Sequence, residues 1–306
     1  MSVSPPLSPG TGYVGRFAPS PTGALHFGSL LAALASYLDA RAHGGVWLVR
    51  IEDIDETRCH ARYALEILQT LRAYGLHWDG AVTVQSQRKS RYEQALDALR
   101  QHGCVYACEC SRREIADSAV NGIDGPVYPG TCRDKGLDLT ANSPPTSTRF
   151  KVDDAPVVFV DRLQGSIAQQ LDRDVGDFVV KRRDGLIAYQ LAVVVDDFDA
   201  GVTHVVRGAD LMDSTARQIA LQTALGYPSP AYLHIPVATN TVGEKLSKQT
   251  LASPLSPDDA GATLRAALRF LNQPIPTATA PVAQLLVEAI EHWQPAAMAA
   301  VRSRAI

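Results

Sequence analysis

Short apolar strands and amphipathic helices alternate in the first part of the chain, and this alternation restricts the fold more than any other feature of the sequence. Residues 13–18 are typical of a strand, 19–23 of a turn, and 26–42 of a helix with apolar residues on one face. A second apolar strand, 46–51, ends at the acidic residue Glu52. Strands that alternate with helices predict an α/β fold with a parallel sheet, and ligands of such sheets bind at the carboxyl ends of the strands.

The α/β pattern is interrupted by a stretch rich in cysteine, glycine and proline. We interpret this stretch, 103–150, as an insertion between two halves of one catalytic domain, 13–102 and 151–250. The remaining residues, 251–306, contain two modest helical patterns and predict a short helical C-terminal segment. In the second half we expect three strands and one helix that ends at a glycine: 157–160, 178–181, 191–195 and 211–226.

Composition and charge restrict the location and the class of the protein. The 306 residues are 46% hydrophobic and 20% charged with a formal net charge of -3, so bulk charge gives no sign of a nucleic-acid partner. The Ser- and Pro-rich residues 1–12 lack the pattern of a signal peptide, and we expect a disordered leader. No apolar run has the length of a membrane span, and five unevenly spaced cysteines do not suggest a disulfide framework. We therefore expect a cytoplasmic protein without membrane contact.

Local basic clusters can bind RNA even where the net charge is negative. Arg112-Arg113 and Lys181-Arg182-Arg183 are the candidates in this sequence. Either cluster, taken alone, is more often part of a solvated surface. Both interpretations are open at this point.

Two short motifs together indicate an ATP site: Pro19-Ser20-Pro21-Thr22-Gly23-Ala24-Leu25-His26-Phe27-Gly28 and Lys245-Leu246-Ser247-Lys248-Gln249. His26 falls where the first helix begins, and free backbone N–H groups at that place favour phosphate. Gly28 lets the ligand approach the backbone closely, and the two lysines supply mobile positive charge. The second motif alone is more often an exposed charged loop, but its pairing with the first favours a nucleotide site. We predict His26, Lys245 and Lys248 as catalytic residues, and His26, Gly28 and Lys248 as ATP-binding residues.

These motifs resemble those of class I aminoacyl-tRNA synthetases of the glutamyl type. Residues 15–23 with Leu25-His26, and residues 49–55, are similar to the opening of glutamyl-tRNA synthetases. The resemblance continues through residues 75–79, 182–189 and 206–211, so that it covers most of 13–250. It implies a Rossmann-type catalytic domain that uses ATP, with Mg²⁺, to activate glutamate.

The resemblance also implies a glutamate pocket, which must neutralise one carboxylate, hold an ammonium group and leave the α-carboxylate free. Arginine suits the first task because its planar fork binds a carboxylate with two hydrogen bonds. By position in the matching motifs, Arg16, Arg207 and Tyr189 would recognise the side chain, and Glu52 would hold the ammonium group. Taken alone, an arginine after a glycine is often a surface residue and a lone tyrosine is more often core. The complete set of predicted glutamate-binding residues is Arg16, Phe17, Ala18, Pro19, Ser20, Glu52, Tyr189 and Arg207.

Cysteines gather in the predicted insertion, at Cys108, Cys110 and Cys132. Three thiolates could form part of a tetrahedral zinc site, although the one-residue spacing of the first pair is narrower than usual, and inert buried thiols are an equal alternative. The resemblance favours metal, because short glutamyl-type enzymes carry a Cys-x-Cys and Tyr-x-x-x-Cys zinc site in this region. It implies one structural zinc ion held also by Tyr128, with Cys104 or His102 as possible substitutes.

Only residues 250–306 follow the second motif, and this length cannot supply the large helical anticodon-binding region of a full-length glutamyl-tRNA synthetase. The chain therefore resembles the truncated members of the family, which Ser29 and Gln249 also fit. This resemblance implies activation of glutamate without tRNA and its transfer to queuosine in the anticodon of tRNA-Asp. We also expect a monomer. A minimal enzyme that charges tRNA-Glu, and an inactive glutamate- or RNA-binding protein, are the alternatives.

Overall fold

The computed structural model describes residues 12–118, 120–123, 125–139, 145–240, 253–276 and 279–306. Two regions singled out in the sequence therefore lie outside the described residues: the expected leader, apart from Gly12, and the motif with Lys245 and Lys248. Within the described ranges, no helix combines the length and the apolar character needed to cross a membrane.

The first half of the catalytic domain is a parallel sheet, as predicted. Strand β1 (Val14–Phe17) pairs in parallel with β2 (Val46–Ile51), and β2 pairs in parallel with the short β3 (Thr83–Val84). The crossover from β1 to β2 is helix α1 (Phe27–Ala42), which packs on both strands. This strand, helix, strand unit is the right arrangement for a ligand site at the ends of β1 and β2.

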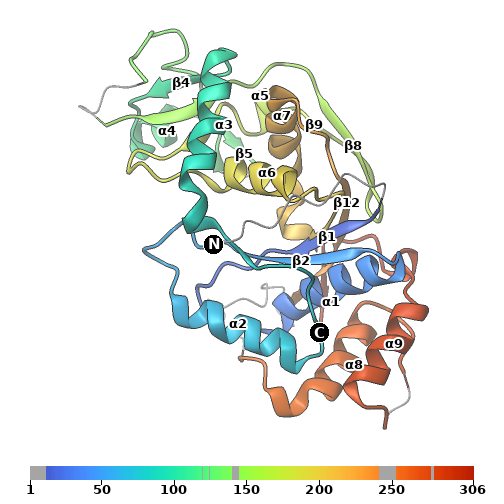
Figure 1. Cartoon of the computed structure of the whole chain (residues 1–306). Helices are drawn as coiled ribbons and strands as arrows, with labels where there is room; N and C mark the ends of the chain where they lie inside the picture. The colour runs from blue at the N-terminus through green and yellow to red at the C-terminus, as the bar shows by residue number, and fades with distance from the viewer. Residues whose placement is uncertain (1–11, 119, 124, 140–144, 241–252, 277–278) are drawn as a thin grey trace.

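A second set of parallel strands lies beside β1. Strand β11 (His204–Gly208) pairs in parallel with β12 (Ala231–Ile235), and β12 pairs in parallel with β8 (Val157–Asp161). The backbone N–H of Thr203, next to β11, donates to the carbonyl of Val14 in β1 at 2.9 Å. The two sets of strands are separate sheets that lie side by side, with β1 next to β11, and α1 packs on β11 as well (Figure 1).

The C-terminal segment is helical, as expected, and packs against α1. Helices α8 (Ala260–Phe270) and α9 (Val282–Glu291) contact α1 and each other, and their apolar residues belong to the same core as β1 and β2. Trp293, which follows α9, donates its indole N–H to the fully buried carboxylate of Asp39 at 2.9 Å. The segment is thus an integral part of the catalytic domain's core.

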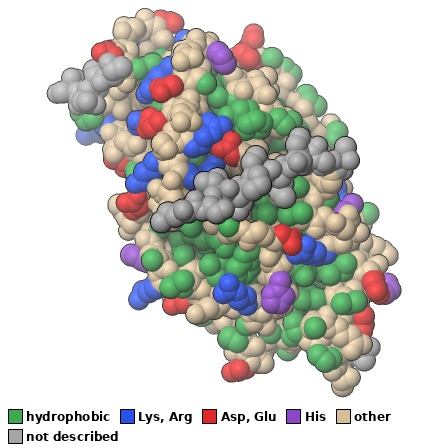
Figure 2. All heavy atoms as spheres, viewed as in Figure 1, with side chains coloured by type: hydrophobic (Ala, Val, Ile, Leu, Met, Phe, Trp, Pro, Cys, Tyr) green, Lys and Arg blue, Asp and Glu red, His purple; other side chains and the backbone are tan. Residues whose placement is uncertain are grey.

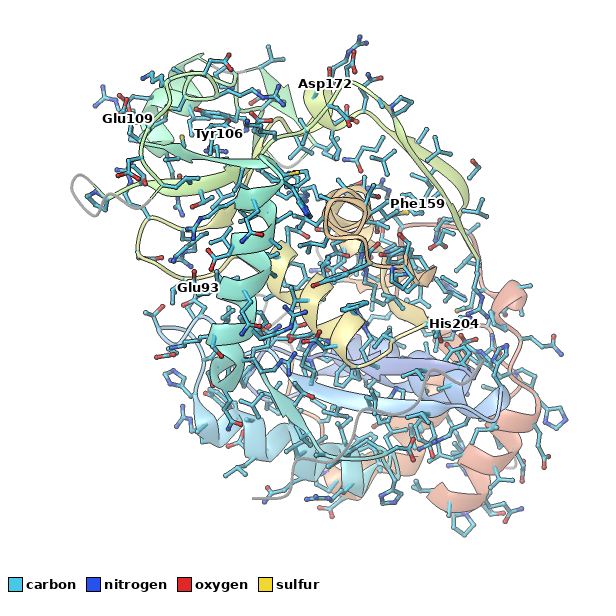
Figure 3. All side chains as sticks on the ribbon, turned by 45° about the horizontal axis from the view of Figure 1, so that its top comes forward. Glu93, Tyr106, Glu109, Phe159, Asp172 and His204 are labelled. Carbon is cyan, nitrogen blue, oxygen red and sulfur yellow. The ribbon has the colours of Figure 1, made fainter. Side chains whose placement is uncertain are left out.

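The cysteine-rich stretch forms a separate small sheet at the end of the molecule opposite α8 and α9 (Figure 1). Strands β4 (Val105–Cys108), β7 (Ser147–Phe150) and β10 (Phe178–Lys181) form an antiparallel sheet, which Tyr106 in β4 marks in Figure 3. The third strand comes from outside 103–150. The limits of the insertion, 103–150, and of the two flanking halves of the catalytic domain therefore remain a proposal, because this small sheet includes a strand from the second half.

The expected strand at 191–195 is wrong. These residues belong to helix α6 (Tyr189–Asp199), in which Leu191 to Asp197 are all buried. Helix α6 packs between α3 (Lys89–Gln101) and α7 (Thr215–Leu225), so that it is covered on several sides. A helix buried all round has no amphipathic period, and the β-branched run imitated a strand.

The other expected elements are present, including the glycine cap of α7, where Gly226 adopts φ 70°. The described residues also contain α2 (Ala61–Ala73), α4 (Arg112–Ser118), α5 (Leu171–Asp174), β5 (Asn121–Gly122), β6 (Gly125–Pro126), β9 (Gly165–Gln169), β13 (Val237–Thr239) and β14 (Ser303–Ala305). Short 3-10 turns are η1 (Gln85–Arg88), η2 (Ala209–Ser214), η4 (Pro257–Asp259) and η5 (Pro295–Ala297). Phe159 in β8 lies beside α7 in Figure 3 and packs with Val205 and Tyr232.

Candidate functional site

A cavity of about 480 Å³ opens at the carboxyl ends of β1, β2, β11 and β12, with the first turn of α1 along one side. Because these strands are parallel, their ends meet at one edge of the sheet, where α/β proteins bind ligands. Every predicted glutamate- or ATP-binding residue among those described lines this cavity: Arg16, Phe17, Ala18, Pro19, Ser20, His26, Gly28, Glu52, Tyr189 and Arg207.

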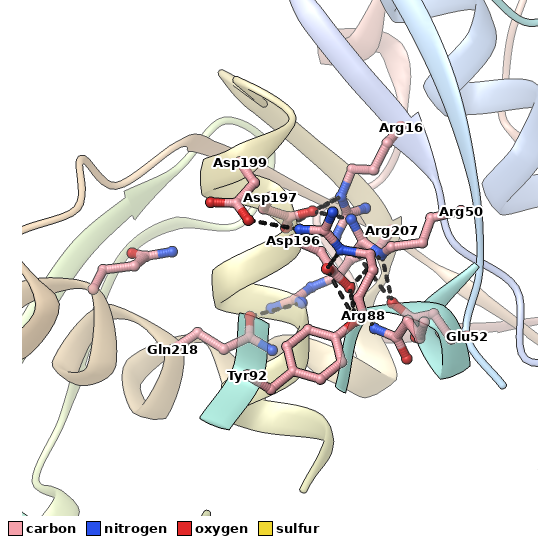
Figure 4. A network of polar contacts seen from close by, with 12 residues as sticks. Arg16, Arg50, Glu52, Arg88, Tyr92, Asp196, Asp197, Asp199, Arg207 and Gln218 are labelled. Carbon is pink, nitrogen blue, oxygen red and sulfur yellow. Dashed lines mark hydrogen bonds and ion pairs between the residues drawn. The ribbon is translucent and has the colours of Figure 1, made fainter. Parts of the chain in front are cut away.

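Buried ion pairs hold the acidic and basic side chains on one side of the cavity (Figure 4). Arg16 donates from Nε to both carboxylate oxygens of Asp197, at 3.1 and 3.3 Å. Arg50 donates to the same carboxylate at 2.7 Å and to Oε1 of Glu52 at 3.1 Å. Burial raises the pKa of Glu52, although Arg50 and Arg16 oppose this effect. For Asp197, burial also favours the neutral acid, but the two arginines prevail and its pKa is lowered.

Arg207 differs from these arginines because no acidic residue in the described part of the chain pairs with it. Its guanidinium donates to His234, Gln218 and Thr215, each at 2.9 Å. Burial raises the pKa of the neighbouring Tyr189, and the charge of Arg207 opposes that effect. The cavity therefore contains one buried cation whose partners are all neutral, which favours an anionic ligand.

The N-terminus of α1 opens onto the same cavity. His26 is the N-cap: its Nδ1 accepts from the backbone N–H of Ser29, and the Ser29 hydroxyl accepts from the N–H of His26, both at 3.4 Å. This reciprocal capping gives Ser29 a structural role. Helix α1 thus presents its positive end to the cavity, and this end suits a phosphate group.

The two flanks of the second lysine motif also lie at the cavity. On the N-terminal flank, Val237 and Ala238 of β13 line it. On the C-terminal flank, Pro254 forms an antiparallel bridge with His26, and the N–H of Leu255 donates to the carbonyl of Leu25 at 2.9 Å. Lys245 and Lys248 themselves lie outside the described residues.

The thiols of Cys108, Cys110 and Cys132 converge in the insertion, with all three sulfur atoms within 4.8 Å of one another. The Tyr128 hydroxyl lies 3.3 Å from the sulfur of Cys108 and 3.6 Å from that of Cys110. Zinc bonds of about 2.0 to 2.3 Å in a tetrahedron separate neighbouring ligand atoms by roughly 3.5 Å, so the four side chains fit such a site. The other candidates contact different groups: Nδ1 of His102 lies 3.1 Å from the carbonyl of Ala224, and Cys104 donates to the carbonyl of His102.

Without a metal, Cys110 and Tyr128 favour the protonated form. For Cys108, burial has the same effect, but the hydrogen bonds from Tyr128 and Arg149 prevail and lower the pKa. Burial and the neighbouring thiols raise the pKa of Cys110 to about 11, against the opposing hydrogen bond from Tyr128. Burial also raises the pKa of Tyr128, and its thiol neighbours add to this. A bound cation inverts this balance because it stabilises thiolate and phenolate.

The basic cluster at 181–183 has partners inside the chain. Lys181 donates to Glu93 at 2.7 Å, Arg182 to Asp55 at 3.2 Å, and Arg183 to the carbonyl of Glu109. On the face shown in Figure 2, Lys and Arg side chains are interspersed with Asp and Glu over the region of α3. The cluster at 181–183 is therefore partly neutralised by acidic residues of the same chain.

The sequence interpretation missed the supporting polar residues around the cavity. Arg50 lies inside the apolar run of β2, and Asp196-Asp197 interrupts the apolar run of α6. Asp161 and His234, both in strands, are also fully or almost fully buried. A charged residue within an otherwise apolar element was the available signal, because such a residue must have a buried partner.

The parallel sheet, the capped helix at the cavity and the paired acidic and basic groups belong, by sequence comparison, to the catalytic domain of a class I aminoacyl-tRNA synthetase. Residues 13–263 match a protein family that is described as "tRNA synthetases class I (E and Q), catalytic domain". The glutamate-tRNA synthetase of Elizabethkingia anophelis has the same fold, with a TM-score of 0.80 over 97% of this chain and 68% of that chain, at 22% identity.

Sequence relatives give a narrower assignment. Glutamyl-Q tRNA(Asp) synthetase of Dechloromonas aromatica is 57% identical over 92% of this chain and 94% of that protein. Glutamyl-Q tRNA(Asp) synthetase of Thiobacillus denitrificans is 53% identical over 92% and 93%. The chain belongs to the glutamyl-Q tRNA(Asp) synthetases, a family of ATP-dependent ligases.

Proposed function

We propose that this chain activates L-glutamate with ATP, without needing tRNA, and transfers it to queuosine at the wobble position of the tRNA-Asp anticodon. The proposal rests on one observation: three groups line the same cavity. They are Arg207, which is a buried cation with neutral partners, the acidic Glu52, and the N-terminus of α1. The names of relatives up to 57% identical support queuosine-containing tRNA-Asp as the acceptor.

In the first step, three groups would orient glutamate. Arg207, with the Tyr189 hydroxyl, would bind the side-chain carboxylate, and Glu52 would accept hydrogen bonds from the ammonium group. The α-carboxylate then faces the α1 end of the cavity, where an oxygen attacks the α-phosphorus of ATP. A phosphorus–oxygen bond forms, the bond to pyrophosphate breaks, and the products are glutamyl-adenylate and pyrophosphate.

His26 and the first turn of α1 would stabilise the charge that develops on the phosphates. Gly28 would allow their close approach to the backbone, and Lys245 and Lys248 would follow the leaving pyrophosphate. Mg²⁺ would accompany ATP as the usual partner of its phosphate oxygens. In the second step, a hydroxyl of the queuosine cyclopentene ring attacks the glutamyl carbonyl, and AMP leaves.

We also propose one structural zinc ion bound by Cys108, Cys110, Tyr128 and Cys132. The zinc ion would cross-link the residues after β4 with those around Tyr128, and it would take no part in the reaction. Metal analysis of the purified chain is expected to give one zinc per molecule, and a metal content near zero would refute the site. A monomer in a reducing cytoplasm remains the proposed setting; none of the five cysteines forms a disulfide, which is consistent with a reducing compartment.

The test of the function is transfer of radiolabelled glutamate to tRNA-Asp with and without queuosine. We expect label only on the queuosine-containing tRNA, and pyrophosphate exchange that depends on glutamate in the absence of any tRNA. Equal labelling of both forms, or labelling of tRNA-Glu, would support a minimal glutamyl-tRNA synthetase instead. Absence of exchange would identify an inactive binding protein.

A further inference from the structure

The side chain of Arg207 is held by three neighbouring strands and one helix. Arg207 in β11 and His234 in β12 are direct partners in the parallel ladder, and Asp161 ends β8 on the far side of β12. The guanidinium Nε donates to Nε2 of His234 at 2.9 Å, while the two terminal nitrogens donate to Gln218 and Thr215 of α7. One N–H group on each terminal nitrogen is left for a ligand in the cavity that Arg207 lines.

The geometry fixes the proton on His234. Because arginine only donates, Nε2 of His234 must be the acceptor, and Nδ1 must carry the proton. Nδ1 lies 2.7 Å from Oδ2 of Asp161, which therefore accepts from it. Asp161 is in turn held by the backbone N–H groups of Leu163 and Gln164, at 3.0 and 2.9 Å.

Burial makes this chain of hydrogen bonds rigid. The side chains of His234 and Asp161 are both 0% exposed, and His234 does not line the cavity. Neither residue can therefore touch a substrate. A polar pair in this position must either stabilise the core or act through the group that it contacts, which is Arg207.

We propose that Asp161 and His234 are positioning residues for the glutamate site: they hold the guanidinium plane of Arg207 so that its two remaining N–H groups bind the substrate's side-chain carboxylate together. This inference rests on the proposed function. His234 accepts the Nε–H and thereby fixes the rotation of the guanidinium, and Asp161 keeps the imidazole in the accepting tautomer.

Two substitutions of His234 separate positioning from simple stabilisation. His234→Asn keeps an N–H near the Nδ1 position for Asp161 but has no acceptor at the Nε2 position. His234→Gln is long enough to place its carbonyl oxygen near the Nε2 position, so that it accepts from Arg207. If the pair only stabilises the core, the two variants should have similar effects on stability and neither should change the KM for glutamate.

The measurement is pyrophosphate exchange by the full chain, with KM for glutamate, KM for ATP and the melting temperature recorded for each variant. We expect His234→Asn to raise the KM for glutamate by about 10-fold to 100-fold, the loss of a hydrogen bond to a charged group, with KM for ATP changed by less than about twofold. His234→Gln should return the KM for glutamate to within about threefold of the wild-type value.

Tyr232→Phe is the matched control. It removes a buried hydroxyl from the same strand, where Gln222 donates to it at 3.1 Å, and it leaves every hydrogen-bond partner of Arg207 in place. Its KM for glutamate should equal that of the wild type. If His234→Asn does not fold, Asp161→Asn probes the same chain from its other end, with an expected rise of about threefold.

An unchanged KM for glutamate in His234→Asn would overturn the inference and leave the proposed function intact. If Asp161→Asn is used in place of His234→Asn, an unchanged KM in that variant has the same consequence. Failure of His234→Gln to improve on His234→Asn would overturn it as well. Absence of exchange in the wild type is a different result, because it would refute the proposed function and this inference with it.

Discussion

Glu52→Gln isolates the binding of the substrate ammonium group. Glu52 is 8% exposed and lines the cavity, and Arg50 donates to its Oε1 at 3.1 and 3.3 Å. No other described residue donates to Oε2, so this oxygen is available to a ligand. Glutamine keeps the shape and one acceptor oxygen, but it removes the charge and presents N–H groups to the ammonium.

A hydrogen bond between charged groups contributes about 1.5 to 3 kcal/mol. Its loss corresponds to a fall of about 10-fold to 150-fold in kcat/KM for glutamate, since each 1.4 kcal/mol is a factor of about ten. The fold should survive, because Arg50 retains Asp197 at 2.7 Å.

The pH dependence gives a second readout. Burial raises the pKa of Glu52 above its ordinary value, against the effect of Arg50 and Arg16. Only the ionised form can bind the ammonium, so kcat/KM for glutamate in the wild type should fall as pH decreases through this raised pKa. A raised pKa also means that the folded state favours the neutral acid, so the contribution of this group to stability is present at low pH and is lost as pH rises through its folded-state pKa. Glu52→Gln should therefore lack the acidic decline and lose no stability at neutral pH.

The assay is glutamate-dependent pyrophosphate exchange between about pH 5 and 8, with urea unfolding at neutral pH. Asp53→Asn is the matched control: it alters the adjacent carboxylate, which accepts from Ser86 at 2.7 and 2.8 Å and does not line the cavity. A Glu52→Gln enzyme with wild-type kcat/KM would refute the assigned role. A variant that loses activity and stability together would refute the argument from the raised pKa.

Three further substitutions test the framework. Asp39→Asn should lower the free energy of unfolding, measured in urea, by about 3 to 5 kcal/mol, because the buried carboxylate accepts hydrogen bonds from Arg162. Burial raises the pKa of Asp39, but its hydrogen bonds prevail and the pKa is lowered. The stability that the Asp39 carboxylate contributes is therefore present above the ordinary carboxyl pKa and is lost as pH falls through the lowered pKa. Cys132→Ser should reduce bound zinc at least tenfold by metal analysis without changing the KM for glutamate; a full complement of zinc would contradict the site. Gly176→Ala should lower the melting temperature, because φ is +73° and a Cβ would lie 2.5 Å from the carbonyl oxygen of Tyr128; an unchanged value would contradict this.

The sequence predicted the elements that have a clear period. Helix α1 and strand β2 were expected at nearly their observed limits, because leucines recur at helical spacing in α1, at Leu30, Leu34 and Leu38, and β2 is bounded by turns. The strand expected within α6 failed because its buried run includes the consecutive β-branched residues Val193, Val194 and Val195, which favour a strand when no polar face marks a helix. Local sequence cannot report which elements will cover a segment on all sides.

The residues that we propose to bind the substrate were easier to predict than the residues that support them. Arg16, Glu52 and Arg207 stand in motifs, and the structure brings them to one cavity. Each of the two arginines has a partner that is remote in the chain: Asp197 lies 181 residues from Arg16. His234 lies 27 residues from Arg207. Such pairings follow from the order of strands in the sheet, which residue patterns alone do not specify.

The two buried arginines of the site are held in different ways, and this difference separates their tasks. Arg16 shares Asp197 with Arg50, so much of its charge is already neutralised before a ligand enters. Arg207 has only neutral partners among the described residues, so its charge remains for an anion. Because a buried cation without a counter-ion costs free energy, the free enzyme is less stable than it would be with an acidic partner for Arg207, and glutamate binding supplies the missing charge. We therefore expect Gln218→Glu, which adds such a partner, to raise the melting temperature of the free enzyme and to weaken glutamate binding at least tenfold. A variant that binds glutamate as tightly as the wild type would show that the charge of Arg207 does not select the ligand.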